Sequence, residues 1–364
     1  MSRPPYRVAI LGAGIGAQHV EAFARMPALF RVAILCDADA GRANRLADQL
    51  EARGLDRPAH VADYRDAAVY ASSIDVVDIC LPPWMHADAM RRAIAAGRHV
   101  ICEKPLVGSL DETDELAAAA SAAGVVLMPI FQYRFGRGLA RAKHLMASGA
   151  AGKVFLASIE THWKRGADYY AVPWRGRRET ELGGVMAGHA IHAHDMMTHL
   201  LGPVRAVSAM ATVRVNDIET EDCAGALFEM ADGSIVVSSA TLGSADEHSR
   251  LRISCANVTM TSSLAPYAPD REPWSFVPRD PAGAAALEAA LSGAPSGSEG
   301  YAAQFEGLHA ALTGTGAPPV ALAEARASIE LITAMYHSAR TGSRVALPLG
   351  KDHPGYRDWH GRSR

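Results

Sequence analysis

The sequence predicts a two-domain α/β protein, and three observations carry this prediction. In the first third of the 364 residues, short apolar runs alternate with helical patterns, which is typical of a parallel sheet with helices on both faces. The first apolar run leads directly into a glycine-rich turn at 12–17. After about residue 130, long stretches take on the two-residue period of a mostly antiparallel sheet. We therefore expect one domain over 1–130 and an α+β domain with a large open sheet over 131–364.

The glycine-rich turn reads Gly12-x-Gly14-x-x-Ala17 and lies between a strand pattern and a helical pattern. Gly12 permits a tight turn, Gly14 leaves room for phosphates, and Ala17 lets the helix pack close to the strand. The helix N-terminus supplies N–H groups and a partial positive charge for a pyrophosphate. An ordinary strand–turn–helix corner is the alternative. We predict a Rossmann domain that binds a dinucleotide at Gly12, Gly14, Ile15 and Gly16.

An acidic residue follows the next apolar run. The apolar run 32–36 is followed directly by Asp37, which stands 25 positions after Gly12. A carboxylate near this spacing accepts hydrogen bonds from the ribose hydroxyls of NAD and repels the 2′-phosphate of NADP. The sequence therefore predicts NAD, rather than NADP, as the cofactor.

The other elements of this domain follow from the same patterns. Strands are expected near 6–11, 31–37, 76–80, 99–103 and 125–129, with helices near 15–26, 41–53, 86–96 and 111–123. In such sheets, ligands bind outside the carboxyl ends of the strands, where this sequence places Asp37, Leu81-Pro82 and Glu103-Lys104. Desolvation and a cationic nicotinamide would lower the pKa of Lys104 enough for proton exchange near neutral pH. A surface lysine is the alternative, and position alone favours it.

The second domain is expected to combine one large sheet with a few helices. The patterns predict a helix at 137–148, strands at 153–162, 204–215, 222–230, 234–241 and 248–255, and a final helix at 321–340, with the last helix and strand returning to the domain interface. Asp232-Gly233 is a hairpin signal. Residues 262–300 are rich in Pro, Ala, Gly and Ser, so we expect a long excursion with little regular structure.

A histidine-rich segment runs from Gly183-Gly184 to the helix stop at 200–203. On a helix, His192, Asp195, Met196 and His199 share one face, His189 lies one turn earlier, and His194 points elsewhere. A general base at His192 is the interpretation we favour, a packed or solvent-facing set of histidines is the second, and a metal site is the third. Because no His-Glu-x-x-His pattern is present, we predict no metal.

Composition narrows the classes of protein. The net charge is −3, with both signs scattered along the chain, which argues against a nucleic-acid partner. No apolar stretch is long enough to span a membrane, and the five dispersed cysteines include no Cys-x-x-Cys pair. We expect a cytoplasmic protein with reduced thiols and no membrane partner.

Five motifs in order resemble those of the glucose-fructose oxidoreductase, inositol dehydrogenase and rhizopine catabolism family (Gfo/Idh/MocA), over nearly the whole chain. They are Gly12-x-Gly14-x-x-Ala17, Leu81-Pro82-x-x-x-His86, Glu103-Lys104-Pro105, Gly183-Gly184 with His192-x-x-Asp195, and Ala334-x-Tyr336-x-Ser338-Ala339-Arg340-Thr341-Gly342.

The resemblance implies an NAD(P)-dependent oxidation of a secondary hydroxyl on a sugar, sugar derivative or cyclitol. It implies that His192 removes the hydroxyl proton and that Lys104 hydrogen-bonds the reacting oxygen. It assigns the neighbourhood of Leu81, Pro82, His86 and Glu103 to the cofactor. It also implies a homo-oligomer, a dimer or tetramer, formed through the open sheet.

One position departs from the family pattern. Many members carry Asp four residues before the catalytic histidine, where this chain has Gly188. His189 or Asp195 is expected to replace that carboxylate. The preceding loop carries Trp163, Tyr169, Trp174 and Arg175, which suit sugar rings and hydroxyls, and Tyr133 is a further contact. A packed interdomain loop is the alternative.

Three functional hypotheses remain open at this stage. The first is an NAD-dependent sugar or cyclitol dehydrogenase. The second is a glycoside or sugar 3-dehydrogenase, or a keto-sugar reductase working in reverse. The third, from another class, is an NAD-binding sensor or scaffold, against which the presence of both Lys104 and His192 argues.

Overall fold

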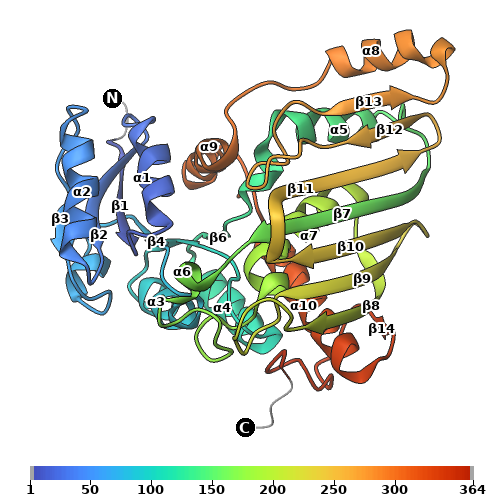
Figure 1. The fold of residues 1–364 in the computed structure, drawn as a ribbon. Helices are drawn as coiled ribbons and strands as arrows, with labels where there is room; N and C mark the ends of the chain where they lie inside the picture. Colours follow the sequence, from blue (N-terminus) through green and yellow to red (C-terminus); the bar gives the residue numbers. More distant parts are fainter. Residues whose placement is uncertain (1–3, 361–364) are drawn as a thin grey trace. The chain divides into compact units, whose positions relative to one another are not determined.

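The computed structural model describes residues 4–360 and divides into two compact units (Figure 1). The first unit runs to Ile130 and also includes Tyr301–Arg326. The second comprises Phe131–Gly300 and continues from Ala327. Residues 301–326, which the sequence analysis assigned to the second domain, thus belong to the first unit. In the described part of the chain, no helix is long and apolar enough to cross a membrane.

The first unit contains a six-stranded parallel sheet of order β3-β2-β1-β4-β5-β6. The strands are β1 (Tyr6–Leu11), β2 (Phe30–Cys36), β3 (Ala59–Val61), β4 (Val76–Ile79), β5 (His99–Cys102) and β6 (Leu127–Pro129). This order is that of the doubly wound dinucleotide-binding fold, which places a ligand at the switch point between the two halves. The predicted parallel α/β sheet is confirmed, and β3 is an additional short strand.

Five helices accompany this sheet. They are α1 (Gly16–Ala24), α2 (Ala40–Glu51), α3 (His86–Ala95), α4 (Leu110–Ala123) and α9 (Gly300–Leu312). The last was not predicted, because its partners are distant in sequence. Its Phe305 ring stacks on Phe23 with ring centroids 4.3 Å apart, and the Tyr6 hydroxyl donates to the Leu312 carbonyl at 2.9 Å. The aromatic core of the first unit therefore depends on a segment from late in the chain.

The second unit contains an eight-stranded sheet of order β13-β12-β11-β7-β10-β9-β8-β14. The strands are β7 (Val154–Lys164), β8 (Val204–Thr212), β9 (Cys223–Met230), β10 (Ile235–Thr241), β11 (Gly243–Cys255), β12 (Val258–Thr261), β13 (Ser275–Pro278) and β14 (Val345–Ala346). β7 and β10 pair in parallel, and the other pairs are antiparallel. Gly233, with φ of +86°, lies in the predicted β9–β10 turn.

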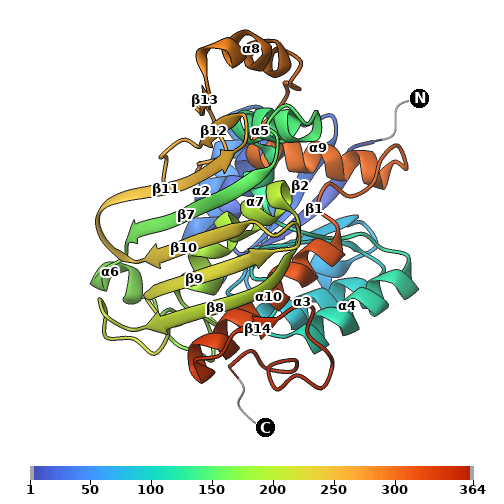
Figure 2. The same cartoon turned by 90° about the vertical axis from the view of Figure 1, so that its right-hand side faces the viewer.

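Helices cover one face of this sheet. They include α7 (Ile191–Leu201) and α10 (Leu322–Thr341), and the unit also has α5 (Arg137–Ala147), α6 (Ala167–Tyr170) and α8 (Ala284–Ser292). On the covered face, the Ser338 hydroxyl accepts the Ala209 N–H at 2.9 Å. The opposite face looks toward the viewer in Figure 2. It exposes a set of apolar side chains, namely Leu156, Met210, Leu227, Ile235 and Val237.

Residues 262–300 are more regular than their composition predicts. They contain β13, which pairs with β12, and α8. Asp270 and Trp274 are buried, and a Cβ added to Gly138 would lie 2.1 Å from the Trp274 ring. The order comes from these close tertiary contacts rather than from a local hydrophobic period, which explains why the sequence pattern missed it.

Candidate active site

The turn between β1 and α1 has the geometry that a pyrophosphate requires. Gly12 has φ of +97°, and a Cβ there would lie 2.4 Å from the Cys80 carbonyl oxygen. No atom lies within 4 Å of a Cβ built on the exposed Gly14. A Cβ on Gly16 would lie 3.0 Å from Ile10, so the helix packs tightly against the strand. Ile15, 44% exposed, completes an open turn at the helix N-terminus, which fits a dinucleotide.

Asp37 follows β2 and is held in place beside this turn. Its Oδ2 accepts the Ala13 N–H at 2.8 Å, and its Oδ1 accepts the Asp39 N–H at 2.8 Å. The Arg42 guanidinium lies 3.4 Å from Oδ2. Each carboxylate oxygen has two lone pairs, so this fixed group still has acceptor capacity for ribose hydroxyls. The residues present therefore fit NAD.

The ends of β4 and β5 lie at the same edge of the parallel sheet as Asp37 and the glycine turn. Leu81, Pro82 and Lys104 are partly exposed there. His86 is buried, with Nε2 2.8 Å from the Leu81 carbonyl oxygen and Nδ1 3.0 Å from that of Pro105. The His86 ring thus joins the two loops that follow β4 and β5 and presents neither nitrogen to a ligand.

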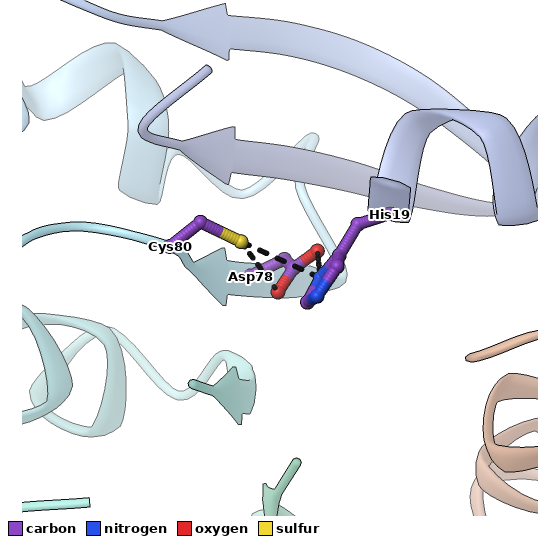
Figure 3. Close-up of side chains that lie close together, drawn as sticks. All are labelled: His19, Asp78 and Cys80. Atoms are coloured by element: carbon purple, nitrogen blue, oxygen red, sulfur yellow. Dashed lines mark hydrogen bonds and ion pairs between the residues drawn. The ribbon is translucent and has the colours of Figure 1, made fainter. Parts of the chain in front are cut away.

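Glu103 is buried and belongs to a polar cluster that the sequence analysis missed. His19 Nε2 lies 3.1 Å from Glu103 Oε1, and His19 Nδ1 lies 2.8 Å from Asp78 Oδ2. Figure 3 shows His19 of α1 facing Asp78 on β4, with the thiol of Cys80 beside them. A signal existed, because Asp78 interrupts the apolar run of a central strand, and a buried carboxylate requires a partner.

In the second unit, the paired glycines before the histidine helix are explained by two distant residues. A Cβ on Gly184 would lie 1.8 Å from the Glu221 carbonyl oxygen, and one on Gly183 would lie 2.3 Å from the Tyr336 hydroxyl. The buried Glu221 carboxylate accepts the Met186 N–H at 3.0 Å and the Tyr336 hydroxyl at 2.9 Å. Burial raises the pKa of Glu221 to about 7, although these hydrogen bonds favour its ionised form.

The helical segment starts with a π-helical turn at Val185–Ala190 and continues as α7. His192 is buried, and its ring lies 4.9 Å from that of Tyr133 and 6.3 Å from that of Phe131. His194 was expected to point away from the face of His192, and its Nε2 lies 2.9 Å from the Ser238 hydroxyl on β10 of the sheet. Burial lowers the pKa of His194 to about 4, which keeps it neutral.

Asp195 lies on the same helix and forms a buried ion pair. Its carboxylate accepts Nε and Nη2 of Arg134 at 2.7 and 2.6 Å, which is the bidentate geometry of a strong pair. The Ser328 hydroxyl lies 3.5 Å from its Oδ1. The structure therefore brings Asp195 to Arg134 in a position that is 1% exposed.

The loop before the helix gathers aromatic and cationic side chains around His189. The Nε2 atom of His189 lies 3.2 Å from the Tyr169 hydroxyl. This hydroxyl also accepts a hydrogen bond from Arg175. The Arg175 guanidinium lies 3.8 Å from the Tyr169 ring and 4.2 Å from the Trp174 ring. Trp163 is buried and donates to the Ser249 hydroxyl at 3.0 Å, so it packs behind the His189 ring.

Gly188 precedes His189 and is half-buried, but its Cβ position is open. Apart from its chain neighbours and the backbone of its own helix, no atom lies within 4 Å of a Cβ built on it. The absence of the family's carboxylate is therefore not imposed by the packing of neighbouring residues.

Among residues 4–360, two groups of side chains bring possible metal ligands within 4.8 Å of one another. They are His19, Asp78 and Cys80 in the first unit, and Glu160, His162 and His248 in the second. In the first group, burial raises the pKa of the Cys80 thiol, which disfavours the thiolate that metals bind. In the second, Arg250 pairs with the Glu160 carboxylate. Both groups thus have partners within the protein.

Comparison with known families identifies both units. The family described as "Oxidoreductase family, NAD-binding Rossmann fold" matches residues 6–131, and the "GFO/IDH/MocA C-terminal domain" matches residues 139–261. Together they cover about two thirds of the chain. The chain belongs to the Gfo/Idh/MocA family of oxidoreductases. It is therefore an NAD-binding oxidoreductase: the glycine turn and Asp37 predicted NAD, and the resemblance of the five motifs implied the oxidoreductase.

Several proteins of this family are similar to the chain. D-glucoside 3-dehydrogenase of Escherichia coli is 27% identical in an alignment 365 positions long, which covers 95% of this chain and 99% of that protein. The uncharacterized oxidoreductase YrbE of Bacillus subtilis is 31% identical over 211 residues, so the match spans 57% of each protein. The WlbA dehydrogenase of Chromobacterium violaceum, crystallised with NADH and UDP-GlcNAcA, has the same fold. Its TM-score is 0.82 at 24% identity, over 96% of this chain and 98% of that one.

Proposed function

We propose that this protein oxidises a secondary hydroxyl of a sugar, sugar derivative or cyclitol, with NAD as the hydride acceptor. The observation that carries the proposal is the position of Lys104. It follows β5 at the carboxyl edge of the sheet that also carries the glycine turn and Asp37, which is where a dinucleotide binds in such folds. A partly exposed ammonium group at this edge is suited to the reacting end of the cofactor.

The two proposed catalytic side chains have different tasks. Lys104 donates a hydrogen bond to the reacting oxygen and stabilises the alkoxide as it develops. His192 accepts the hydroxyl proton as a general base. The support for His192 is its buried place on α7, where its ring lies 4.9 Å from that of Tyr133 and 6.3 Å from that of Phe131. Bound NAD supplies the acceptor for the hydride.

For substrate recognition, we propose the loop cluster around His189. Its ring nitrogen, the Tyr169 hydroxyl and the Arg175 guanidinium offer both donors and acceptors, and the partly exposed Trp174 offers a ring face, as sugar sites require. We favour His189 over Asp195 as the replacement of the family's aspartate, because both oxygens of Asp195 already accept Arg134. Trp163 and Asp195 are buried and bind other residues of the protein, so we assign them a supporting role rather than substrate contact.

The test is a panel of free sugars, glycosides, sugar acids and cyclitols with NAD, followed by NADH absorbance. For an accepted substrate, Lys104→Ala and His192→Ala are expected to keep NAD affinity and to lower kcat by about 10²–10⁴-fold, the range of general acid–base catalysis. Lys153→Ala and His337→Ala are matched controls outside the proposed site. Turnover by Lys104→Ala at the level of the controls would remove Lys104 from the mechanism.

A glycoside 3-dehydrogenase, or a keto-sugar reductase in the reverse direction, is the second candidate. It is supported by the D-glucoside 3-dehydrogenase of Escherichia coli, which aligns over 95% of this chain. Reduction of the product with borodeuteride marks the oxidised carbon. Deuterium at C3 of a glycoside is expected for this candidate, and deuterium elsewhere rejects it.

We also propose that the open sheet face forms a homo-oligomer. Met210 is 80% exposed and Leu227 is 52% exposed on neighbouring strands, and contiguous apolar surface of this kind marks interaction sites. Light scattering after gel filtration is expected to give a multiple of 38.5 kDa. The variant Leu227→Arg is expected to lower that mass, and a monomeric native protein would exclude the proposal.

A further inference from the structure

A cluster of three buried polar side chains lies near the carboxyl edge of the sheet in the first unit, and specific hydrogen bonds connect its members. His19, Asp78 and Glu103 come from α1, β4 and the end of β5, and each is at most 3% exposed. His19 Nδ1 lies 2.8 Å from Asp78 Oδ2, and His19 Nε2 lies 3.1 Å from Glu103 Oε1. One imidazole therefore bridges two buried carboxylates, and Figure 3 shows the side of the bridge that faces Asp78.

This geometry identifies the charge state of the bridge. Only a protonated imidazole has two N–H donors, and both ring nitrogens here face carboxylate oxygens. Burial lowers the pKa of His19, but the charge of Asp78 and the hydrogen bonds of Asp78 and Cys80 raise it well above its ordinary value overall. The Cys80 thiol is 3.7 Å from Asp78 Oδ1. Both ring nitrogens of His19 thus face carboxylate oxygens, and its raised pKa favours the protonated, positively charged imidazole.

The bridge continues from Glu103 to Lys104. Glu103 Oε1 also accepts the Tyr301 hydroxyl at 3.2 Å, and Glu103 Oε2 accepts the backbone N–H of Lys104 at 3.1 Å. The Tyr301 ring lies 4.6 Å from the His19 ring. His19 of α1 and Tyr301 of α9 therefore hold the Glu103 carboxylate in place, and this carboxylate in turn holds the backbone N–H of Lys104.

We propose that His19 is a positioning residue for Lys104: by bridging Asp78 and Glu103, it holds the carboxylate that accepts the Lys104 N–H. This inference rests on the proposed function, in which Lys104 holds the reacting oxygen. Positioning of a catalytic group within a few tenths of an ångström changes rate more than affinity. Loss of the bridge is therefore expected to lower kcat and to leave the binding of NAD unchanged.

Two substitutions separate the halves of the bridge. The amide nitrogen of Gln reaches the position of Nε2, so His19→Gln keeps the hydrogen bond to Glu103. The amide nitrogen of Asn reaches the position of Nδ1, so His19→Asn keeps the bond to Asp78 alone. His309→Asn, which changes a histidine packed on Tyr6 and Phe30 in the same unit, is the matched control for general loosening.

The first readout is steady-state kinetics of the full-length protein with the sugar that the panel identifies. We expect kcat of His19→Asn to fall at least tenfold, kcat of His19→Gln to fall about threefold or less, and KM, NAD affinity and the His309→Asn control to stay within twofold. The alkaline limb of the pH profile is expected to shift in His19→Asn. Equal losses in the Gln and Asn variants would contradict the proposal.

The second readout needs no substrate, so it separates this inference from the proposed function. The rate of reductive methylation of Lys104, followed by mass spectrometry in the NAD complex as a function of pH, reports the environment of its ammonium group. A changed Lys104 profile in His19→Asn, with native-like profiles in His19→Gln and His309→Asn, is expected. Identical profiles in all four proteins would overturn the inference, even if Lys104→Ala abolishes turnover.

Discussion

Each of the two units contains a glycine turn and a buried glutamate, but the two glutamates have different partners. In the first unit, Glu103 faces the positive charge of His19. In the second, Glu221 faces only backbone N–H groups and the Tyr336 hydroxyl. The pKa of Glu221 rises to about 7 because burial outweighs these neutral donors. The difference teaches that neutral donors can fix a buried carboxylate in place without the counter-charge that His19 supplies in the first unit.

The largest expected effect comes from the glycine turns. In the second unit, Gly184→Ala places a Cβ 1.8 Å from the Glu221 carbonyl oxygen, so the backbone of one segment must move. We expect a loss of more than about 4 kcal/mol in the free energy of unfolding, which is in the range of severe overpacking and strain. Urea denaturation measures it.

The comparison is sharpened by Gly12→Ala in the first unit. The new Cβ would lie 2.4 Å from the Cys80 carbonyl oxygen, at a backbone φ of +97°. We expect this variant mainly to lose affinity for NAD, which calorimetry measures. A Gly184→Ala variant as stable as the native protein would contradict the close approach of the Gly184 backbone to the Glu221 carbonyl oxygen.

An intermediate effect is expected from pH. The folded-state pKa of Glu221 is raised, so its stabilising contribution is present below about pH 4.5 and is lost as pH rises to about 7. Relative to Glu221→Gln, the native protein is expected to lose about 3 kcal/mol of unfolding free energy between pH 4.5 and 7.5, because each pKa unit corresponds to about 1.4 kcal/mol. Denaturant titrations at several pH values measure the difference.

The first unit provides the contrast for this measurement. The pKa of His19 is also raised, but its contribution is complete below about pH 6.5 and is lost only as pH rises through the higher folded-state value. The difference between the native protein and His19→Gln is therefore expected to stay constant from pH 4.5 to 6.5. If the unfolding free energies of the native protein and Glu221→Gln differed by the same amount at every pH, the proposed distinction between Glu103 and Glu221 would be wrong.

The smallest expected effect is at Gly188. Its Cβ position is open, and Ala has a higher helix propensity than Gly. Gly188→Ala is therefore expected to change the free energy of unfolding by no more than about 1 kcal/mol, in the stabilising direction. Gly188→Asp is expected to fold as well and to change the choice of substrate on the sugar panel. Unfolding of either variant would show that this glycine, like Gly184, is required by packing.

Local features of the site could be predicted from the sequence because their parts are close along the chain. Gly12 and Asp37 each follow one of the two strands of a single strand–helix–strand unit, and their roles follow from backbone conformation and ribose chemistry. The helical position of His194, turned away from His192, followed from the period of the helix. The two-residue period predicted the antiparallel sheet.

The supporting residues could not be predicted in this way. His19 meets Glu103 across 84 positions, Arg134 meets Asp195 across 61, and Glu221 meets Gly184 across 37. No local period encodes these pairs, since each depends on how strands are ordered in a sheet. The buried Asp78 shows that a charge inside an apolar strand marks such a partner even when the partner itself is unknown.

The return of residues 301–326 to the first unit has a consequence for synthesis on the ribosome. The stretch 131–300 interrupts the first unit, and Phe305 and Leu312 bind against residues made some 300 positions earlier. The nucleotide-binding half is therefore complete only once residue 326 has been made, although its glycine turn emerges first. Until then its nascent chain exposes the Phe23 side of α1, and a fragment cut at residue 130 would keep that apolar surface for good. A minimal NAD-binding fragment should instead join 1–130 to 301–326 through a short linker.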